Sequence, residues 1–145
     1  MKLKLRLVQD GKTVFEVPLS PTDWPKQQLQ DAFEAAEEDF QKYSRIFDAL
    51  AHQTRLRMMR RLVQEEHDTT SFADFMKDLD LNPKTVWENS KKLEESGFVE
   101  KTGRGKYSCS EFGQTTFMMM SLALRRLIES MQETERSREV KNNDF

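Results

Sequence analysis

The stretch from Ser71 to Val99 constrains the fold of this chain more than any other part of the sequence. It reads SFADFMKDLDLNPKTVWENSKKLEESGFV, and two short helical patterns meet in it at a tight connection, residues 80–83. Asn82 can cap a helix with its side-chain oxygen, and Pro83 suits the first helical turn, where its missing N–H costs nothing. Gly97 suits the end of that second helix, because glycine readily adopts the left-handed conformation found there. The stretch therefore predicts two helices joined by a tight turn.

The residues after Gly97 predict a two-stranded hairpin. Residues 98–101 and 107–109 are strand-like runs, and residues 103–106 form a turn rich in glycine and positive charge. Arg104 lies at the tip, where the flanking glycines let the backbone approach a partner closely. Two helices followed by such a hairpin predict a winged helix-turn-helix, in which an arginine at the wing tip suits a phosphate or a narrow minor groove.

Three further phrases carry a resemblance to a known family. IFDALAHQTRLR, at residues 46–57, resembles the segment that opens the winged-helix core of ArsR-family transcription regulators. TVWENSKKLEESGFVE and YSCSEFGQ resemble the recognition helix, wing and wing exit of that family. The resemblance covers residues 44–120 and implies a homodimer that binds double-stranded DNA and regulates transcription. Family habit favours repression.

The predicted second helix buries Val86 and Leu93 and presents its other side chains to a ligand. First-turn side chains of such helices usually contact base edges and phosphates, asparagine can pair with adenine, and lysine can reach guanine or phosphate. Ser90 stands where the resembled family commonly has leucine, and Glu88 where it commonly has a polar or basic residue. Trp87 could contact a thymine methyl or the sugar backbone, or could pack on the domain surface. The candidate DNA-contacting residues are Lys84, Thr85, Trp87, Glu88, Asn89, Lys91 and Lys92 on the helix, and Arg104 and Lys106 on the wing.

Two apolar seams flank this core. In residues 20–50 and again in residues 111–133, large apolar side chains recur at spacings of three and four, which predicts long helices. Thr22 or Asp23 can cap the first helix, which is expected to break near Ser44. Each seam could face the core of its own subunit, but the first and last helices of the resembled family form its dimer interface. The candidate dimer-interface residues are Leu29, Phe33, Phe40, Phe117, Met120, Leu124, Leu127 and Met131.

Residues 1–19 alternate between apolar and polar side chains and predict a β-hairpin with one leucine face. A three-residue loop that ends at Gly11 would set Leu5 opposite Phe15 and keep apolar residues together, whereas a two-residue loop would mix the faces. We therefore expect the three-residue loop. Because an isolated hairpin is barely stable in water, its leucine face must cover its own domain or a partner subunit.

Composition limits the remaining functions. The 145 residues have a formal net charge of −2, which argues against indiscriminate coating of nucleic acid but not against specific binding. An arginine cluster at residues 55–61 suits either phosphate contact or a solvated helix face. Cys109 is the only cysteine, which favours a reducing cytoplasm, and no apolar run approaches the ~20 residues of a membrane span.

The sequence offers no metal site, cofactor site or catalytic set. Residues 71–80 contain no cysteine, and His52 and His67 are not spaced as ligands on one helical face. His52 is expected to cap or pack instead. No nucleophile–base pair or phosphate-binding loop is recognisable, so we expect a protein that is not an enzyme.

We therefore expect a mainly α fold with a small β part, a winged helix-turn-helix with an N-terminal β-hairpin and long N- and C-terminal dimerisation helices. The expected divisions are residues 1–19, hairpin; 20–50, first helix; 51–110, DNA-binding core; 111–133, last helix; and 134–145, a disordered tail. The expected function is sequence-specific binding of double-stranded DNA by a cytoplasmic homodimer on an inverted repeat. The alternative is a protein–protein interaction module in a transcription or replication complex.

Overall fold

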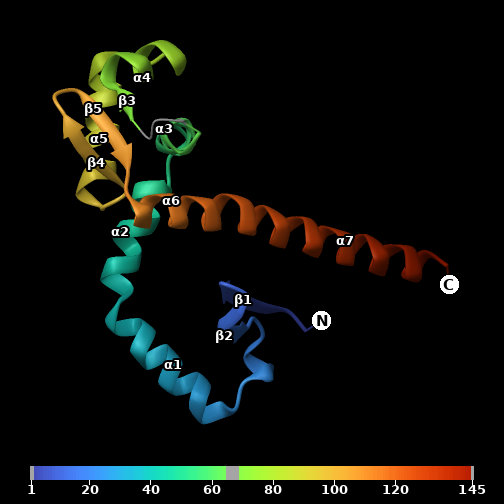
Figure 1. The fold of residues 1–145 in the computed structure, drawn as a ribbon. Helices are drawn as coiled ribbons and strands as arrows, with labels where there is room; N and C mark the ends of the chain where they lie inside the picture. The colour runs from blue at the N-terminus through green and yellow to red at the C-terminus, as the bar shows by residue number, and fades with distance from the viewer. Residues whose placement is uncertain (1, 65–68, 145) are drawn as a thin grey trace. The chain divides into compact units, whose positions relative to one another are not determined.

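A computed structural model describes residues 2–64 and 69–144, which form two compact units that divide between Ser44 and Arg45 (Figure 1). The first unit contains β1 (Lys4–Gln9), β2 (Lys12–Pro18), the 3₁₀ helix η1 (Pro21–Asp23), α1 (Lys26–Glu38) and the start of α2 (Phe40–Leu50). The second contains the end of α2, then α3 (Gln53–Val63), β3 (Thr70–Ser71), α4 (Phe72–Asp78), α5 (Pro83–Glu95), β4 (Val99–Gly103), β5 (Lys106–Cys109), α6 (Glu111–Met118), the π-helical η2 (Met119–Ala123) and α7 (Leu124–Asn143). Within the described ranges, no helix has the length and apolarity needed to cross a membrane.

The N-terminal hairpin has a different register from the one predicted. Its turn is the two-residue Asp10–Gly11, and both residues have positive φ (51° and 77°), as a type I′ turn requires. Leu5 lies opposite Val17 and Leu7 opposite Phe15, so the prediction of a three-residue loop is wrong. An irregularity after Leu7 adds one residue to β2 and brings the apolar positions beyond it back onto one face.

The rest of the first unit also departs from the prediction in detail. Pro25 occupies the N-cap position of α1 without a side-chain hydrogen bond, so the prediction that Thr22 or Asp23 caps this helix is wrong. The helical run breaks at Asp39 rather than near Ser44. Among the described residues of this unit, none is buried.

The helix-turn-helix forms as the sequence predicts. Ser71 caps α4 in a reciprocal capping box, and the Asn82 side chain accepts a hydrogen bond from the Thr85 backbone N–H at 2.8 Å. Pro83 is the first residue of α5, and Gly97 follows the helix with φ of 82°. These local signals define where α4 and α5 begin and where α5 ends.

The wing strands β4 and β5 belong to a three-stranded sheet in the order β3-β5-β4. β4 and β5 pair antiparallel, with Lys101 opposite Tyr107, and β3 adds Thr70 opposite Tyr107 on the other edge of β5. The predicted wing hairpin is therefore confirmed. Residues 65–68, which precede β3 in the sequence, lie outside the described residues.

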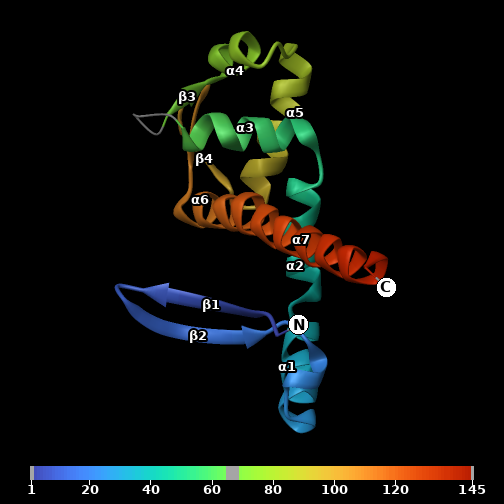
Figure 2. The same cartoon turned by 90° about the vertical axis from the view of Figure 1, so that its right-hand side faces the viewer.

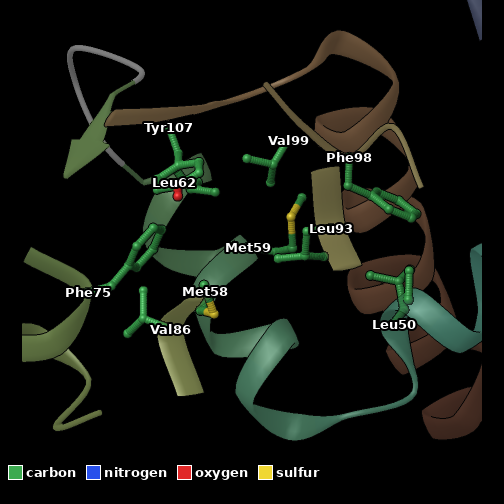
Figure 3. Close-up of a cluster of buried hydrophobic side chains, with 11 residues drawn as sticks. Leu50, Met58, Met59, Leu62, Phe75, Val86, Leu93, Phe98, Val99 and Tyr107 are labelled. Atoms are coloured by element: carbon green, nitrogen blue, oxygen red, sulfur yellow. The ribbon is translucent and has the colours of Figure 1, made fainter. Parts of the chain in front are cut away.

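In the second unit, the hydrophobic core lies between α3 and the end of α2, α4, α5 and the wing strands. Figure 3 shows Phe75 beside Tyr107 at one end of the cluster and Leu50 near Phe98 at the other. The rings of Phe75 and Tyr107 are 6.2 Å apart between centroids. The buried hydrophobic residues are Ala49, Leu50, Met58, Met59, Leu62, Phe75, Val86, Leu93, Phe98, Val99 and Tyr107. They come from α2, α3, α4, α5, β4 and β5, with Phe98 just before β4, so this core closes within one chain.

The C-terminal helix is longer than predicted. Figure 2 shows α6 and α7 as one continuous helix, which starts at Glu111 and continues through η2 to Asn143. The prediction of a disordered tail from residue 134 is therefore wrong for residues 134–143. No described residue of α7 is buried.

Candidate nucleic-acid interface

A buried arginine positions α5. The Arg55 guanidinium donates to the backbone oxygens of Ala49 (2.6 Å) and Asp48 (2.9 Å) and to Oδ1 of Asn89 (2.9 Å), and Arg55 is 8% exposed. It therefore binds the last carbonyl groups of α2 and holds α5 against them. A positive charge also suits the C-terminus of α2, where the helix dipole is negative.

The contacts of His52 and Arg55 explain the role of the IFDALAHQTRLR motif, residues 46–57. His52 is the N-cap of α3, and its Nδ1 accepts a hydrogen bond from the Thr54 backbone N–H at 3.2 Å. The prediction that His52 caps is therefore confirmed. The motif thus ends α2, caps α3 and supplies the arginine that joins both helices to α5.

The structure does not present Asn89 to a ligand. Its side chain is 9% exposed, accepts from Arg55 and donates from Nδ2 to the Thr85 carbonyl at 2.7 Å. The predicted adenine contact is therefore not available to it. A signal for this was present in the sequence, because Arg55 shares one helix face with Met59 and Leu62 at spacings of four and seven.

Lys92 forms an ion pair within the domain. Its Nζ lies 2.9 Å from a carboxylate oxygen of Asp48, at the end of α2. The hydrogen bond and the positive charge of Lys92 hold the pKa of the Asp48 carboxyl below its ordinary value of 3.8. This ion pair is a second link between α5 and the end of α2.

The outward face of α5 combines charge with one large aromatic side chain. Trp87 is 55% exposed, and the Nζ of Lys91 lies 4.9 Å from its ring centroid. Lys84 and Glu88 form a loose pair at 3.9 Å, with side chains 84% and 55% exposed. Thr85 is half-buried in the first turn. Four of the predicted contact residues, Lys84, Trp87, Glu88 and Lys91, thus share one exposed face.

The wing presents its cations beside its glycines. Arg104 and Lys106 are both exposed. The turn is attached to the domain because the Phe72 backbone N–H donates to the Gly105 carbonyl at 2.7 Å. Gly105 has a positive φ of 69°, which favours glycine there.

A close backbone contact fixes the exit of the wing. Ser110 caps α6, donating from Oγ to the Gly97 carbonyl at 2.5 Å and accepting from the Gly113 N–H at 2.9 Å. A Cβ at Gly113 would lie 2.1 Å from the carbonyl oxygen of Phe98. Only glycine fits at this position, where the start of α6 meets the chain between α5 and β4.

The predicted arginine cluster separates into different roles. Arg55 is buried, and Arg61 pairs with Asp78 at 2.9 Å. Arg57 and Arg60 are exposed and bond to glutamine side chains four residues away, Gln53 (3.5 Å) and Gln64 (3.3 Å) respectively. Phosphate contact stays a prediction for Arg57 and Arg60.

Comparison with known proteins identifies the architecture. No family model and no curated protein matches the sequence. A homodimeric winged helix-turn-helix DNA-binding domain from Mycobacterium bovis, described as a possible ArsR-family transcriptional regulator, is similar with a TM-score of 0.54 and 23% identity. That match covers 67% of this chain and 89% of the other. A transcriptional regulator homologue from Pyrococcus horikoshii has a TM-score of 0.51 and 21% identity, over 63% and 97% of the two chains.

The chain has the winged helix-turn-helix fold. The predicted fold class is thereby confirmed. In this fold, α4 and α5 are the helix-turn-helix, α5 occupies the position of the recognition helix, and β4 and β5 form the wing.

Large apolar side chains of α1, α2 and α7 are exposed among the residues that the structure describes. Of the predicted interface residues, Phe33, Phe40, Leu124 and Met131 are 45–59% exposed, and Leu29 and Leu127 are half-buried. Phe117 and Met120 instead pack against the buried core, so their burial needs no second subunit. Within residues 2–64 and 69–144, no group of three or more His, Cys, Asp or Glu side chains is placed to hold a metal ion.

Proposed function

We propose that this chain regulates transcription by binding double-stranded DNA in a sequence-specific manner. The observation that carries the proposal is the exposed outward face of α5. On its inward side, a buried hydrogen bond from Arg55 to Asn89 holds the same helix in place. A rigid helix with such a face suits the major groove of DNA, which admits an α-helix. Arg104 on the neighbouring wing supplies a cation for phosphate or the minor groove.

The distribution of charge supports the same proposal. The chain is acidic overall, with a net charge of −2. The exposed cations of α5 and the wing, Lys84, Lys91, Arg104 and Lys106, are opposed on α5 by Glu88. Because phosphate contacts depend on local positive charge, this surface can bind DNA although the whole chain is acidic.

We propose that the protein acts as a homodimer. The exposed apolar side chains of α1, α2 and α7 would be covered by a second copy, as single helices cannot bury their own apolar faces. Two recognition helices one DNA turn apart, ~34 Å, would read an inverted repeat. The similar domain from M. bovis is homodimeric. We further propose repression, which is the habit of the family that the sequence resembles.

Substitutions on α5 and the wing test the proposal. Lys84→Ala and Arg104→Ala should each weaken binding to a duplex of the preferred sequence and lower the salt slope by about one unit, since each removes one phosphate or base contact. The matched control is Lys12→Ala, which removes an exposed lysine from the hairpin in the other unit. All three variants should melt like the parent protein. Unchanged affinity in both test variants would exclude this interface.

A protein–protein interaction module is the second candidate function. The exposed indole of Trp87 favours it, because tryptophan often anchors protein interfaces. The two functions separate at low salt, where a DNA-binding protein retains duplex fragments and an interaction module does not.

A further inference from the structure

Trp87 lies on a side of α5 from which its side chain cannot pack in the core. The inward side of α5 is filled by Val86, Ser90 and Leu93, which are 0–2% exposed. Trp87 lies outside this face and is 55% exposed. An aromatic side chain of this size gains little from such a position in the isolated chain, so its role is to be sought in what α5 binds.

The neighbours of Trp87 hold its ring without covering it. Lys91, one turn further along α5, places its ammonium group 4.9 Å from the ring centroid. This cation–π contact restricts the indole while leaving it more than half exposed. Lys84 and Glu88 pair with each other at 3.9 Å on the same face of the helix. The result is one exposed apolar surface among charged side chains.

The chemistry of the major groove limits what this surface can recognise. Most base edges there present hydrogen-bond donors and acceptors, and an apolar ring would remove water from them without replacing their bonds. The one methyl group that an unmodified base presents there is the 5-methyl group of thymine. We propose that the Trp87 indole reads a thymine in each half-site by packing against this methyl group. This inference rests on the proposed function of DNA binding.

Uracil substitution tests the contact directly, because uracil keeps the base-pairing groups of thymine and lacks only the methyl group. A duplex of the preferred sequence is prepared with each thymine replaced in turn, and affinity is measured by fluorescence anisotropy. Wild-type protein should lose about three- to fivefold in affinity at one thymine per half-site, the effect of removing one buried methyl group.

Variants assign that loss to Trp87. Trp87→Ala should bind the thymine duplex and the uracil duplex with the same affinity at that position. Trp87→Phe should keep part of the preference for thymine over uracil. Lys84→Ala is the matched control on the same helix face: it should weaken binding to both duplexes and preserve their ratio. Because Trp87 is exposed, thermal melting of Trp87→Ala should match the parent.

The outcomes distinguish this inference from the proposed function. If Trp87→Ala retains the full uracil effect, or if no thymine is sensitive in wild-type protein, the methyl contact is excluded while DNA binding stands. If Trp87→Ala weakens every sequence equally, the indole contacts the sugar-phosphate backbone and the inference is again excluded. If wild-type protein binds no duplex at low salt, the proposed function fails together with the inference.

Discussion

The winged core and the segments that flank it contain similar apolar side chains but use them differently. Among the described residues, the buried hydrophobic side chains all lie from Ala49 to Tyr107, and none in 2–44 or 117–144 is buried. The core elements converge from several directions and cover one another. The hairpin and the long helices are single layers, and a single layer cannot bury its own apolar face. The core is therefore complete in one chain, and we infer that the flanks become complete only in an assembly.

The largest effect on the core is expected from Gly113→Ala. The added methyl group would overlap the Phe98 backbone, which is held by the start of α6, so the free energy of unfolding should fall by about 3 kcal/mol or more. Gly103→Ala is the matched control, since a Cβ there meets nothing within 4 Å. Equal stability of the two variants in chemical denaturation would show that the contact between α6 and Phe98 does not support the core.

Arg55→Ala should have the next largest effect. It leaves the Asp48 and Ala49 carbonyls and the Asn89 amide without their donor, which should cost about 2–3 kcal/mol of unfolding free energy. Arg57→Ala, two residues away on the exposed side, should change the stability by less than about 0.5 kcal/mol. Urea denaturation of both variants measures the difference. Similar values would mean that the buried guanidinium does not join α2 to α5.

Charges on the C-terminal flank should change assembly rather than the fold of the core. Leu124→Glu combined with Met131→Glu places two carboxylates at positions that are each 45% exposed in one chain. We expect sedimentation to shift from a dimer to the 17.1 kDa monomer while a cooperative melting transition remains. An unchanged dimer would place the interface elsewhere, and loss of the transition would show that the flank belongs to the core.

The smallest expected effect is a change in one pKa. Lys92→Gln should raise the pKa of Asp48 towards its ordinary value of 3.8, since Lys92 supplies the hydrogen bond and charge that lower it. The pKa of Asp74, lowered by hydrogen bonds from Ser71, should stay unchanged as a control. Carboxyl NMR titration measures both. A parallel rise of the two would indicate a general loss of structure instead of a lost ion pair.

The Asp48 pair also sets the direction of a pH effect. A carboxyl with a lower pKa in the folded chain than in the unfolded chain adds stability above its unfolded pKa. That contribution is lost as the pH falls through the lowered folded pKa. The stability difference between the parent and Lys92→Gln should therefore be present at neutral pH and vanish at acid pH.

The features predicted well from the sequence are those set by a few neighbouring residues. Asn82 and Pro83 start α5 and Gly97 ends it, through a side-chain cap and backbone geometry within one turn. Such signals depend little on distant parts of the chain. They were sufficient to predict the helix-turn-helix and the wing.

The predictions that failed depend on partners distant in the sequence or on irregular pairing. Asn89 has the right side chain for adenine, but Arg55, 34 positions away, binds it in the interior. In the hairpin, an irregularity after Leu7 restores the match of apolar faces that the prediction assigned to a longer loop. Local spacing can indicate that Arg55 is buried, but it does not identify the second segment on which each of these features depends.

The most direct test of the account is binding of the purified chain to random genomic duplex fragments across a salt series, followed by sequencing of the retained fragments. A dimer of winged cores predicts a steep loss of affinity with salt and enrichment of an inverted repeat with half-sites about one helical turn apart. Retention of no fragment even at low salt would contradict the assignment of α5 and the wing as a DNA-binding surface.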